Sequence, residues 1–329
     1  MKNLAIIGGG SWGTALAIVL APRFELVRLW VYESDLAERM YASRINDVYL
    51  PGFPLPENVE PHNELPFTVA GAEIVLGVIP SHLARSMYQQ LAPHLTPEMH
   101  LVSATKGLEQ GTLMRMSEVM AAVLERPRVA VISGPTFARE VARGDPTALV
   151  VASTDQELAR VIQNAFSGPT FRLYSSSDPI GVEIGGAVKN VVAIGAGVCH
   201  GLGLGHNAAA ALITRGLAEI SRLALAMGGQ AKTLAGLAGL GDLVLTCTGE
   251  LSRNRMVGIE LSKGRKLEEI VNSMKMVAEG IKTTTATADL ALRYAVEMPI
   301  AGQMLAMLHH GRSPQEAIRQ LMERSLKGE

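Results

Sequence analysis

Apolar runs of strand length alternate with stretches of helical spacing along the first half of the chain. The stretch 12–20, for example, has helical spacing and meets no breaker before Pro22. Such alternation predicts βαβ units around a largely parallel sheet. A proline-rich stretch over 51–61 is predicted to be a loop. The predicted strands are 3–7, 26–32, 73–79, 100–104, 128–132, 147–152 and 170–174.

From about residue 181 the pattern changes to long helical runs without a comparable β-rich stretch. The chain has 329 residues, and about 150 residues per domain suggests two domains. The predicted fold is α/β: a Rossmann-like, mainly parallel sheet domain over 1–180, followed by an all-helical domain over 181–329. The predicted helices of the second domain are 184–196, 208–227, 253–261, 267–277, 284–294, 302–309 and 314–323.

Composition narrows the classes of function. Hydrophobic residues make up 48% of the chain, enough for a packed core. The 30 Lys and Arg residues balance 31 Asp and Glu residues, and aromatics are only 4%, so nucleic-acid binding is not expected. The two cysteines, Cys199 and Cys247, lack metal-ligand spacing and are too few for a disulfide framework. We therefore expect a cytoplasmic protein with reduced thiols and no metal.

Two stretches have the length or character of a membrane segment. The apolar N-terminus resembles a signal peptide, but three glycines at 8–10 interrupt it. The stretch 190–214 has no charged residue and is long enough to span a bilayer. It also holds several glycines, with His200, His206 and Asn207, which favour two buried helices joined by a glycine-rich loop. No membrane span is expected.

A glycine-rich motif follows the first predicted strand. Gly8, Gly10 and Gly13 fit GxGxxG, and Glu33 stands 20 residues beyond Gly13, at the end of the second strand. In a dinucleotide site the first glycine makes a tight turn, the second admits the pyrophosphate and the third lets the helix pack on the strand. The helix N-terminus then offers free amides to the phosphates. The alternative is a tight strand-to-helix turn without a ligand.

Glu33 affects whether NAD(H) or NADP(H) is the preferred cofactor. Glu33 accepts ribose hydroxyls and repels a 2′-phosphate, which favours NAD(H). Arg28 lies on the same predicted strand and could help to accommodate a phosphate, although its side chain is expected to point elsewhere. The cofactor is therefore expected to be NAD(H), NADP(H) or both.

Lys189 stands in an apolar helical stretch, where an unpaired ammonium is costly to bury. Burial lowers the pKa of a lysine and suits it to general acid–base chemistry near neutrality. The alternative is a lysine that reaches solvent from the helix edge. Asp242 is either its partner or the N-cap of a helix from Leu243, and Thr246 shares the face of Asp242. Asn190 could hydrogen-bond a ligand or a loop carbonyl.

Polar residues also follow other predicted strands. Lys106 comes after the strand 100–104, and Gly134 and Thr136 follow the strand 128–132. Parallel sheets bind ligands at the carboxyl ends of their strands, so these positions suit a substrate. Lys106 could equally be an ordinary surface lysine, and Thr136 could cap the helix that follows.

A short polar segment begins a predicted helix of the second domain. Ser252 as a cap, free amides and the Arg253 guanidinium together make a phosphate site. The alternative is an ordinary capped surface helix. His200 and His206 flank a glycine loop but lack a third ligand, so no metal site is expected there.

The chain resembles the NAD(P)-dependent sn-glycerol-3-phosphate dehydrogenases, most closely the bacterial form. The likeness runs over nearly the full length and rests on several motifs in order. These are 8–17 (GGGSWGTALA), 78–82 (VIPSH), 104–109 (ATKGLE), 132–138 (ISGPTFA), 185–197 (GGAVKNVVAIGAG), 207–219 (NAAAALITRGLAE) and 239–255 (GLGDLVLTCTGELSRNR).

The resemblance implies a reversible reduction of dihydroxyacetone phosphate by NAD(P)H to sn-glycerol 3-phosphate, a precursor of glycerophospholipids. It implies that Lys189 is the general acid and base, that Lys106 contacts substrate and cofactor, and that Asp242 lies near the catalytic lysine. The expected substrate-binding residues are Lys106, Gly134, Thr136, Lys189, Asn190, Asp242, Ser252, Arg253 and Asn254. With the glycine motif, the expected cofactor-binding residues are Gly8, Gly10, Ser11, Trp12, Gly13, Tyr32, Glu33, Lys106, Ala138, Arg253, Val277 and Glu279.

One departure concerns cofactor choice. Bacterial members often carry His or Arg around Tyr32 or Glu33, whereas the segment 30–33 (WVYE) looks more like that of NAD-preferring eukaryotic members. The preference between NAD and NADP stays open. The long apolar helices also allow a homodimer, although no single patch marks its interface.

Two other functions compete with this one. A related two-domain reductase could act on another small hydroxy acid, but the phosphate segment 252–254 would then have no role. A nucleotide sensor could bind NAD(H) without turnover, but it would not need Lys189 in an apolar stretch.

Overall fold

The computed structural model describes residues 1–125, 128–274 and 278–325. One eight-stranded sheet has the order β3-β2-β1-β4-β5-β6-β7-β8, and every neighbouring pair is parallel except β6 with β7. The chain reverses direction across the sheet between β1 and β4, where a doubly wound fold binds its ligand. The strands are β1 (Asn3–Ile7), β2 (Leu26–Trp30), β3 (Val59–His62), β4 (Ile74–Gly77), β5 (His100–Ser103), β6 (Val129–Ser133), β7 (Thr147–Ala152) and β8 (Phe171–Ser176).

Strand β3 overlaps the proline-rich stretch 51–61 for which a loop was predicted, so that prediction is wrong at residues 59–61. Pro61 pairs with Leu29 of β2, and β3 is the edge of the sheet. A proline is tolerated there because an edge strand needs hydrogen bonds on one side only.

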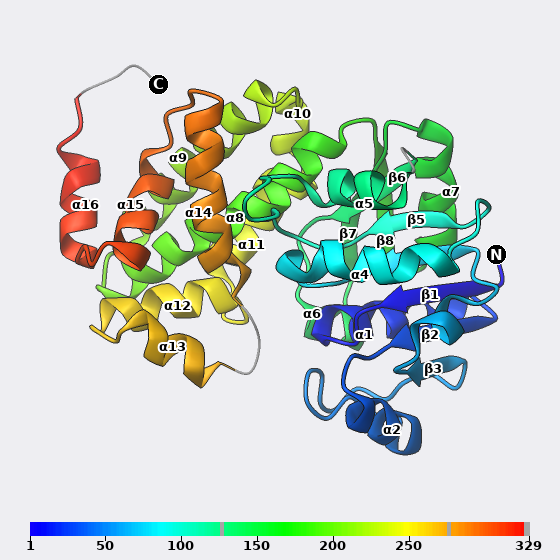
Figure 1. The fold of residues 1–329 in the computed structure, drawn as a ribbon. Coiled ribbons are helices and arrows are strands. Elements are labelled where there is room, and N and C mark those ends of the chain that lie inside the picture. The colour runs from blue at the N-terminus through cyan, green and yellow to red at the C-terminus, as the bar shows by residue number, and fades with distance from the viewer. Residues whose placement is uncertain (126–127, 275–277, 326–329) are drawn as a thin grey trace.

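Helices cover both faces of the sheet (Figure 1). Along β1, Leu4 and Ile6 pack into one hydrophobic cluster, while Ala5 and Ile7 pack into another on the opposite face. This burial on both faces explains why the strands read as continuous apolar runs. The helices of this part are α1 (Ser11–Leu20), α2 (Ser34–Ser43), α3 (Leu65–Val69), α4 (Ala84–Leu91), α5 (Met116–Leu124), α6 (Ala138–Arg143) and α7 (Gln156–Phe166), with short 3-10 turns η1 (Ala21–Arg23), η2 (Ser81–Leu83) and η3 (Ala92–His94).

The described residues after β8 form helices and no strand, as the sequence predicts. They gather beside the sheet domain in Figure 1, around the long helix α8. The helices are α8 (Pro179–Gly201), α9 (His206–Ala226), α10 (Ala231–Leu234), α11 (Asp242–Thr248), α12 (Arg253–Ser262), α13 (Leu267–Ser273), α14 (Glu279–Arg293), α15 (Pro299–His309) and α16 (Pro314–Met322), with a π-helical turn η4 (Leu237–Gly241) before α11.

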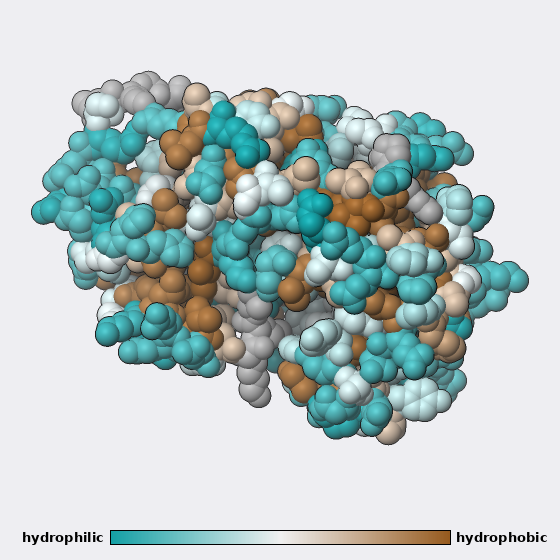
Figure 2. All heavy atoms as spheres, viewed as in Figure 1, coloured by the Kyte–Doolittle hydropathy of each residue, from teal (hydrophilic) through white to brown (hydrophobic). Residues whose placement is uncertain are grey.

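Helix α8 is the core of this helical body. It is long and apolar enough to cross a membrane, but its most apolar window is wholly buried inside the fold. The uncharged stretch 190–214 divides between α8 and α9, as expected. A Cβ at Gly197 would lie 1.9 Å from the Arg255 carbonyl oxygen, so only glycine lets α12 approach α8 this closely. On the face seen in Figure 2, polar side chains cover most of the surface and apolar ones gather in scattered patches.

Polar contacts of Glu183 and Glu279 help to fasten the helical body to the sheet domain. Glu183, buried in the first turns of α8, accepts hydrogen bonds from Arg115 and from the backbone and hydroxyl of Ser117 at the start of α5. Ser81, after β4, donates to Glu279 Oε2 at 2.7 Å, at the start of α14. The carboxyl ends of the central strands therefore face the helical body.

Candidate active site

The glycine-rich loop leaves room for a pyrophosphate. Gly8 has φ of +129°, and a Cβ there would lie 2.3 Å from the Val78 carbonyl oxygen. A Cβ at Gly13 would lie 1.8 Å from the Gly8 carbonyl oxygen, so α1 packs directly on the turn. At Gly10 nothing stands within 4 Å, and no side chain caps α1. These residues fit a dinucleotide, because the open space meets free amides at a helix N-terminus.

Two more of the expected cofactor residues line this loop. Ser11 and Trp12 begin α1 and are half-buried. The indole nitrogen of Trp12 is buried, and among the described residues it has no hydrogen-bond partner. Ala138 begins α6, also half-buried, and packs against the cluster that contains α1. Val277 lies outside the described residues.

The residues at the end of β2 have different surroundings. Glu33 is half-buried, and its Oε1 accepts a hydrogen bond of 2.7 Å from the Tyr49 hydroxyl. Tyr32 is 77% exposed and lies edge-on to the Trp30 ring. Arg28 points elsewhere: it donates to two backbone carbonyls around α3 and lies over an aromatic ring. Arg28 is therefore not placed to bind a 2′-phosphate.

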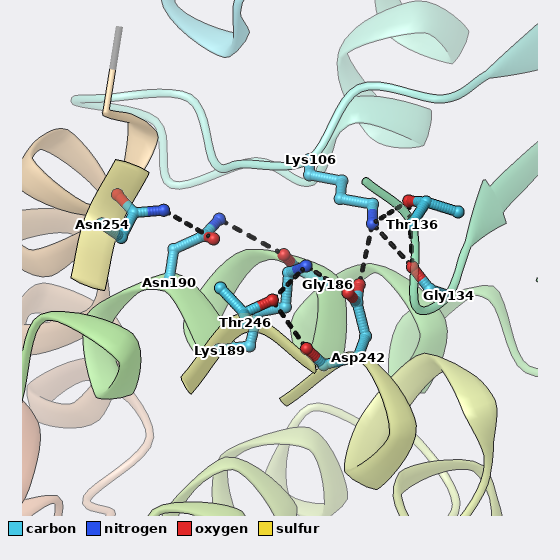
Figure 3. Close-up of polar contacts among 9 residues, drawn as sticks. All are labelled: Lys106, Gly134, Thr136, Gly186, Lys189, Asn190, Asp242, Thr246 and Asn254. Atoms are coloured by element: carbon cyan, nitrogen blue, oxygen red, sulfur yellow. Dashed lines mark hydrogen bonds and ion pairs between the residues drawn. The ribbon is translucent and has the colours of Figure 1, made fainter. Parts of the chain in front are cut away.

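Lys189 lies on α8 with only 5% of its surface exposed. Its ammonium is ion-paired with the Asp242 carboxylate and donates a hydrogen bond of 2.9 Å to Thr246 Oγ1 (Figure 3). Burial lowers the pKa of Lys189 to about 7, although the Asp242 charge opposes that shift. The alternative of a lysine that reaches solvent is wrong.

Asp242 joins two lysines that come from different parts of the fold. Its fully buried carboxylate binds Lys189 through Oδ1 and receives Lys106 Nζ at 2.8 Å through Oδ2. Lys106, after β5, also donates to the Gly134 carbonyl at 2.9 Å and to Thr136 Oγ1 at 3.1 Å. In Figure 3 the two ammonium groups meet at the Asp242 carboxylate, each at a different oxygen.

Two capping alternatives are therefore wrong. Asp242 is the first residue of α11, directly after the π-helical turn η4, and its side chain binds lysines rather than helix amides. The N-cap of α6 is Phe137, while the Thr136 hydroxyl accepts from Lys106. Single π turns occur often at functional sites, because they redirect a side chain within a helix.

The segment at the start of α12 lies beside this cluster. Ser252 caps α12 by accepting from the Arg255 amide at 3.2 Å. Asn254 Nδ2 donates to Asn190 Oδ1 at 2.8 Å, and Asn254 Oδ1 accepts from the Gly280 amide at 2.9 Å. These bonds tie α12 to α8 and α14, which places both asparagine side chains near Lys189 in Figure 3.

Arg253 lies at the start of α12. Within the described part of the chain, its half-buried guanidinium makes no hydrogen bond or ion pair. Burial lowers its pKa, and the charge of Glu279 opposes that shift. A desolvated guanidinium with free donors is suited to a phosphate or carboxylate.

The structure thus unites Lys106, Gly134, Thr136, Lys189 and Asp242 in one network, with Asn190 and Asn254 next to it. Three residues that sequence reasoning did not select also hold the site together, namely Asn46, Tyr49 and Ser81. Asn46 and Tyr49 lie in a loop and Ser81 begins the 3-10 turn η2, and no periodicity marks any of them. Among the described residues, no group of three His, Cys, Asp or Glu side chains could hold a metal.

A dinucleotide cradle at the turning point of a parallel sheet, next to a buried lysine in a helical body, defines a two-domain nucleotide-dependent dehydrogenase. The family models for the N-terminus and C-terminus of NAD-dependent glycerol-3-phosphate dehydrogenase match residues 3–159 and 178–319. The chain belongs to this family.

Curated relatives match this chain along nearly its whole length. Proteins named glycerol-3-phosphate dehydrogenase (NAD(P)+) from Koribacter versatilis and Syntrophotalea carbinolica are 56% and 53% identical, covering 98% and 99% of this chain and the same shares of their own lengths. The crystal structure of glycerol-3-phosphate dehydrogenase from Coxiella burnetii superposes with a TM-score of 0.95 at 43% identity, covering 98% of this chain and 99% of that one.

Proposed function

We propose that this protein catalyses the reversible reduction of dihydroxyacetone phosphate by NAD(P)H to sn-glycerol 3-phosphate, with Lys189 as the general acid. The observation that carries the proposal is the buried Lys189 ammonium, ion-paired with Asp242 where the helical body meets the sheet domain. Residues 1–180 would hold the cofactor, and residues 181–329 would supply the substrate site and the catalytic lysine. The family membership of both segments supports this division.

The substrate phosphate belongs at the start of α12. Arg253 brings its guanidinium donors, Ser252 caps a ten-residue helix, and Asn254 is held next to Asn190. A phosphate would satisfy the Arg253 guanidinium, which has no partner among the residues that the structure describes. This argues for a phosphorylated substrate and against a reductase of an unphosphorylated hydroxy acid.

The chain's own residues supply the proton chemistry. When bound, the reduced nicotinamide supplies the hydride that the carbonyl carbon receives. Lys189 donates its proton to the carbonyl oxygen during reduction, and the neutral amine takes the hydroxyl proton in reverse. Its pKa of about 7 keeps both forms populated near neutrality. The Lys106 ammonium adds positive charge where the oxygen becomes negative.

The cofactor would lie on the glycine-rich loop. Gly8, Gly10 and Gly13 would cradle the pyrophosphate against the N-terminus of α1, and Glu33 would face the ribose. The family's NAD(P)+ names support either nicotinamide nucleotide as cofactor.

Three finer expectations remain predictions: a cytoplasmic location, a supply of glycerol phosphate for glycerophospholipid synthesis, and a homodimer. The two free thiols, one of them buried, agree with a reducing compartment. Light scattering of the purified protein would measure the oligomeric state.

The test compares Lys189→Ala with Lys263→Ala, a control lysine that pairs with Glu260 on the surface. Turnover of dihydroxyacetone phosphate is followed by NADH absorbance at 340 nm, and NADH binding by calorimetry. Lys189→Ala should lose at least ~10²-fold in kcat because the general acid is removed. It should bind NADH normally because the glycine-rich loop is unchanged, and a melting curve verifies that it is folded.

Three results would contradict the proposal. Full turnover by Lys189→Ala would remove this lysine from its role. Equal turnover of unphosphorylated dihydroxyacetone would favour the hydroxy-acid reductase. NADH binding by the unmodified protein without any turnover would favour the sensor.

A further inference from the structure

The Glu33 carboxylate is held by a side chain from outside its own strand and helix. Tyr49 lies on the loop after α2, and its hydroxyl donates to Glu33 Oε1 at 2.7 Å. Both side chains are half-buried. This bond, together with burial, raises the pKa of Tyr49 to about 12, so the phenol stays a donor at neutral pH. One carboxylate oxygen is thereby fixed, and the other is left to accept from a ligand.

Asn46 fixes Tyr49 in turn. Its side chain is fully buried and donates 2.8 Å hydrogen bonds to the Gly9 carbonyl and to Thr14 Oγ1. Its Oδ1 accepts from the Tyr49 amide at 2.9 Å. Asn46 therefore fixes Tyr49 relative to the glycine-rich loop. Tyr49 in turn fixes the Glu33 carboxylate relative to the same loop.

Arginines on β2 and α2 that could receive a 2′-phosphate are bound elsewhere. Arg28 donates to two backbone carbonyls around α3. Arg39 pairs with aspartates on both sides of it in the sequence. Arg44, the C-cap of α2 with φ of +59°, donates to the carbonyls of Leu55 and of Val59, the first residue of β3. The charged group at the end of β2, where the ribose would bind, is therefore the Glu33 carboxylate.

We propose that Tyr49 is a positioning residue that holds the Glu33 carboxylate toward the ribose hydroxyls and makes the protein select NAD(H) over NADP(H). The inference rests on the proposed function, which leaves the choice of cofactor open. A carboxylate accepts the 2′-hydroxyl of NAD(H), whereas the 2′-phosphate of NADP(H) adds about 1.5 to 2 negative charges at that point. Because Tyr49 prevents Glu33 from turning away, the repulsion cannot be relieved by a side-chain rotation.

The test measures dissociation constants of NADH and NADPH by calorimetry on the purified full chain, without substrate. Tyr49→Phe and Glu33→Gln are made singly and together. Tyr41→Phe, on the exposed face of α2, is the matched control. Melting temperatures verify that each variant is folded, and KM for NADH is measured alongside kcat with dihydroxyacetone phosphate.

The unmodified protein and Tyr41→Phe should bind NADH at least ~10-fold more tightly than NADPH. Tyr49→Phe should lower that ratio about 3- to 10-fold, chiefly through weaker NADH binding, with KM for NADH rising by the same factor. Glu33→Gln should bring the ratio close to one, and adding Tyr49→Phe to it should not change the ratio further.

Equal or tighter binding of NADPH by the unmodified protein would overturn the proposal. So would an unchanged ratio in Tyr49→Phe, or full additivity in the double variant, which would mean that Tyr49 acts independently of Glu33. If Tyr49→Phe melted far below the control, Glu33→Gln alone would decide, since an unchanged ratio there also refutes the selection. Failure of the proposed function would instead appear as binding without turnover in the unmodified protein.

Discussion

Replacing Asp242 with Asn removes one buried negative charge and leaves the shape of the site almost unchanged. Asp242 is fully buried and is bonded to both Lys189 and Lys106. Asparagine keeps a carbonyl oxygen for one of these bonds but no charge for either ammonium. Lys189, which already has its pKa lowered to about 7 by burial, then loses the charge that opposes this shift.

The magnitude follows from the geometry. An opposite charge in direct contact shifts a pKa by roughly 1 to 3 units, and Lys106 remains near Lys189 as a like charge. The pKa of Lys189 should therefore fall from about 7 by roughly 1 to 3 units. At pH 7 the protonated fraction would drop from about one half to between ~10% and ~0.1%, so the reduction should slow about 5- to 500-fold.

The assay is the pH profile of the reduction. The reaction needs the ammonium form, which is present below the pKa of Lys189 and is lost as pH rises through it. The alkaline limb should lie near pH 7 in the unmodified protein and move to lower pH in Asp242→Asn. Asp35→Asn, which breaks a surface pair with Arg39, is the control and should leave the profile unchanged.

The position of the limb decides the outcome. Breaking a buried pair also costs about 3 to 5 kcal/mol of stability, so melting curves and NADH binding must show that the variant is folded. A folded Asp242→Asn protein with a lower rate at every pH and an unmoved alkaline limb would refute the reasoning. Asp242 would then hold the lysines in place without setting the proton affinity of Lys189.

Two further predictions concern binding and stability. Gly10→Ala should keep the melting temperature and weaken NADH binding about 10-fold or more, because its Cβ points into open space meant for the pyrophosphate. Gly13→Ala should lower the free energy of unfolding by about 1 to 3 kcal/mol, because its Cβ would meet the Gly8 carbonyl oxygen at 1.8 Å. Unchanged stability of Gly13→Ala, or unchanged NADH binding by Gly10→Ala, would contradict the respective prediction. Glu219 is buried, and burial raises its pKa to about 7 from the ordinary 4.5, so its contribution to stability is complete below about pH 4.5 and is lost as pH rises through 7. Urea unfolding should show that the stability of Glu219→Gln falls by about 2 to 3 kcal/mol less than that of the unmodified protein between pH 5 and pH 8. Parallel pH dependences of the two proteins would contradict this.

Much of the fold could be predicted from the sequence, because its signals are local. Strands such as β4 and β5 are buried on both faces and read as continuous apolar runs. Strand β3 escaped because it is a short edge strand with polar residues and a proline. It forms a strand because it pairs with β2, and the residues 59–62 alone do not indicate that pairing.

Some residues of the candidate site could likewise be predicted from the sequence, and others could not. A lysine and an aspartate in separate apolar, glycine-flanked stretches each need a partner, so the pairing of Lys189 with Asp242 could be inferred without coordinates. The contact of Lys106 with the same carboxylate required the strand order. Asn46 and Tyr49 could not be found, because loop residues show their role only when the tertiary arrangement sets them against the glycine-rich loop.

The strength of Lys189 as an acid depends on how the two parts of the chain meet. Burial in α8 and the charge of Lys106 both lower its pKa, while Asp242 raises it. Lys106 comes from the sheet domain, and it reaches Asp242 at 2.8 Å only because β5 ends against the helical body. Separating the two parts would remove Lys106 and admit water, and both changes favour the ammonium and make it a weaker acid. A pKa near neutrality therefore belongs to the joined arrangement, which is also the arrangement that brings the dinucleotide cradle and the phosphate segment to one site.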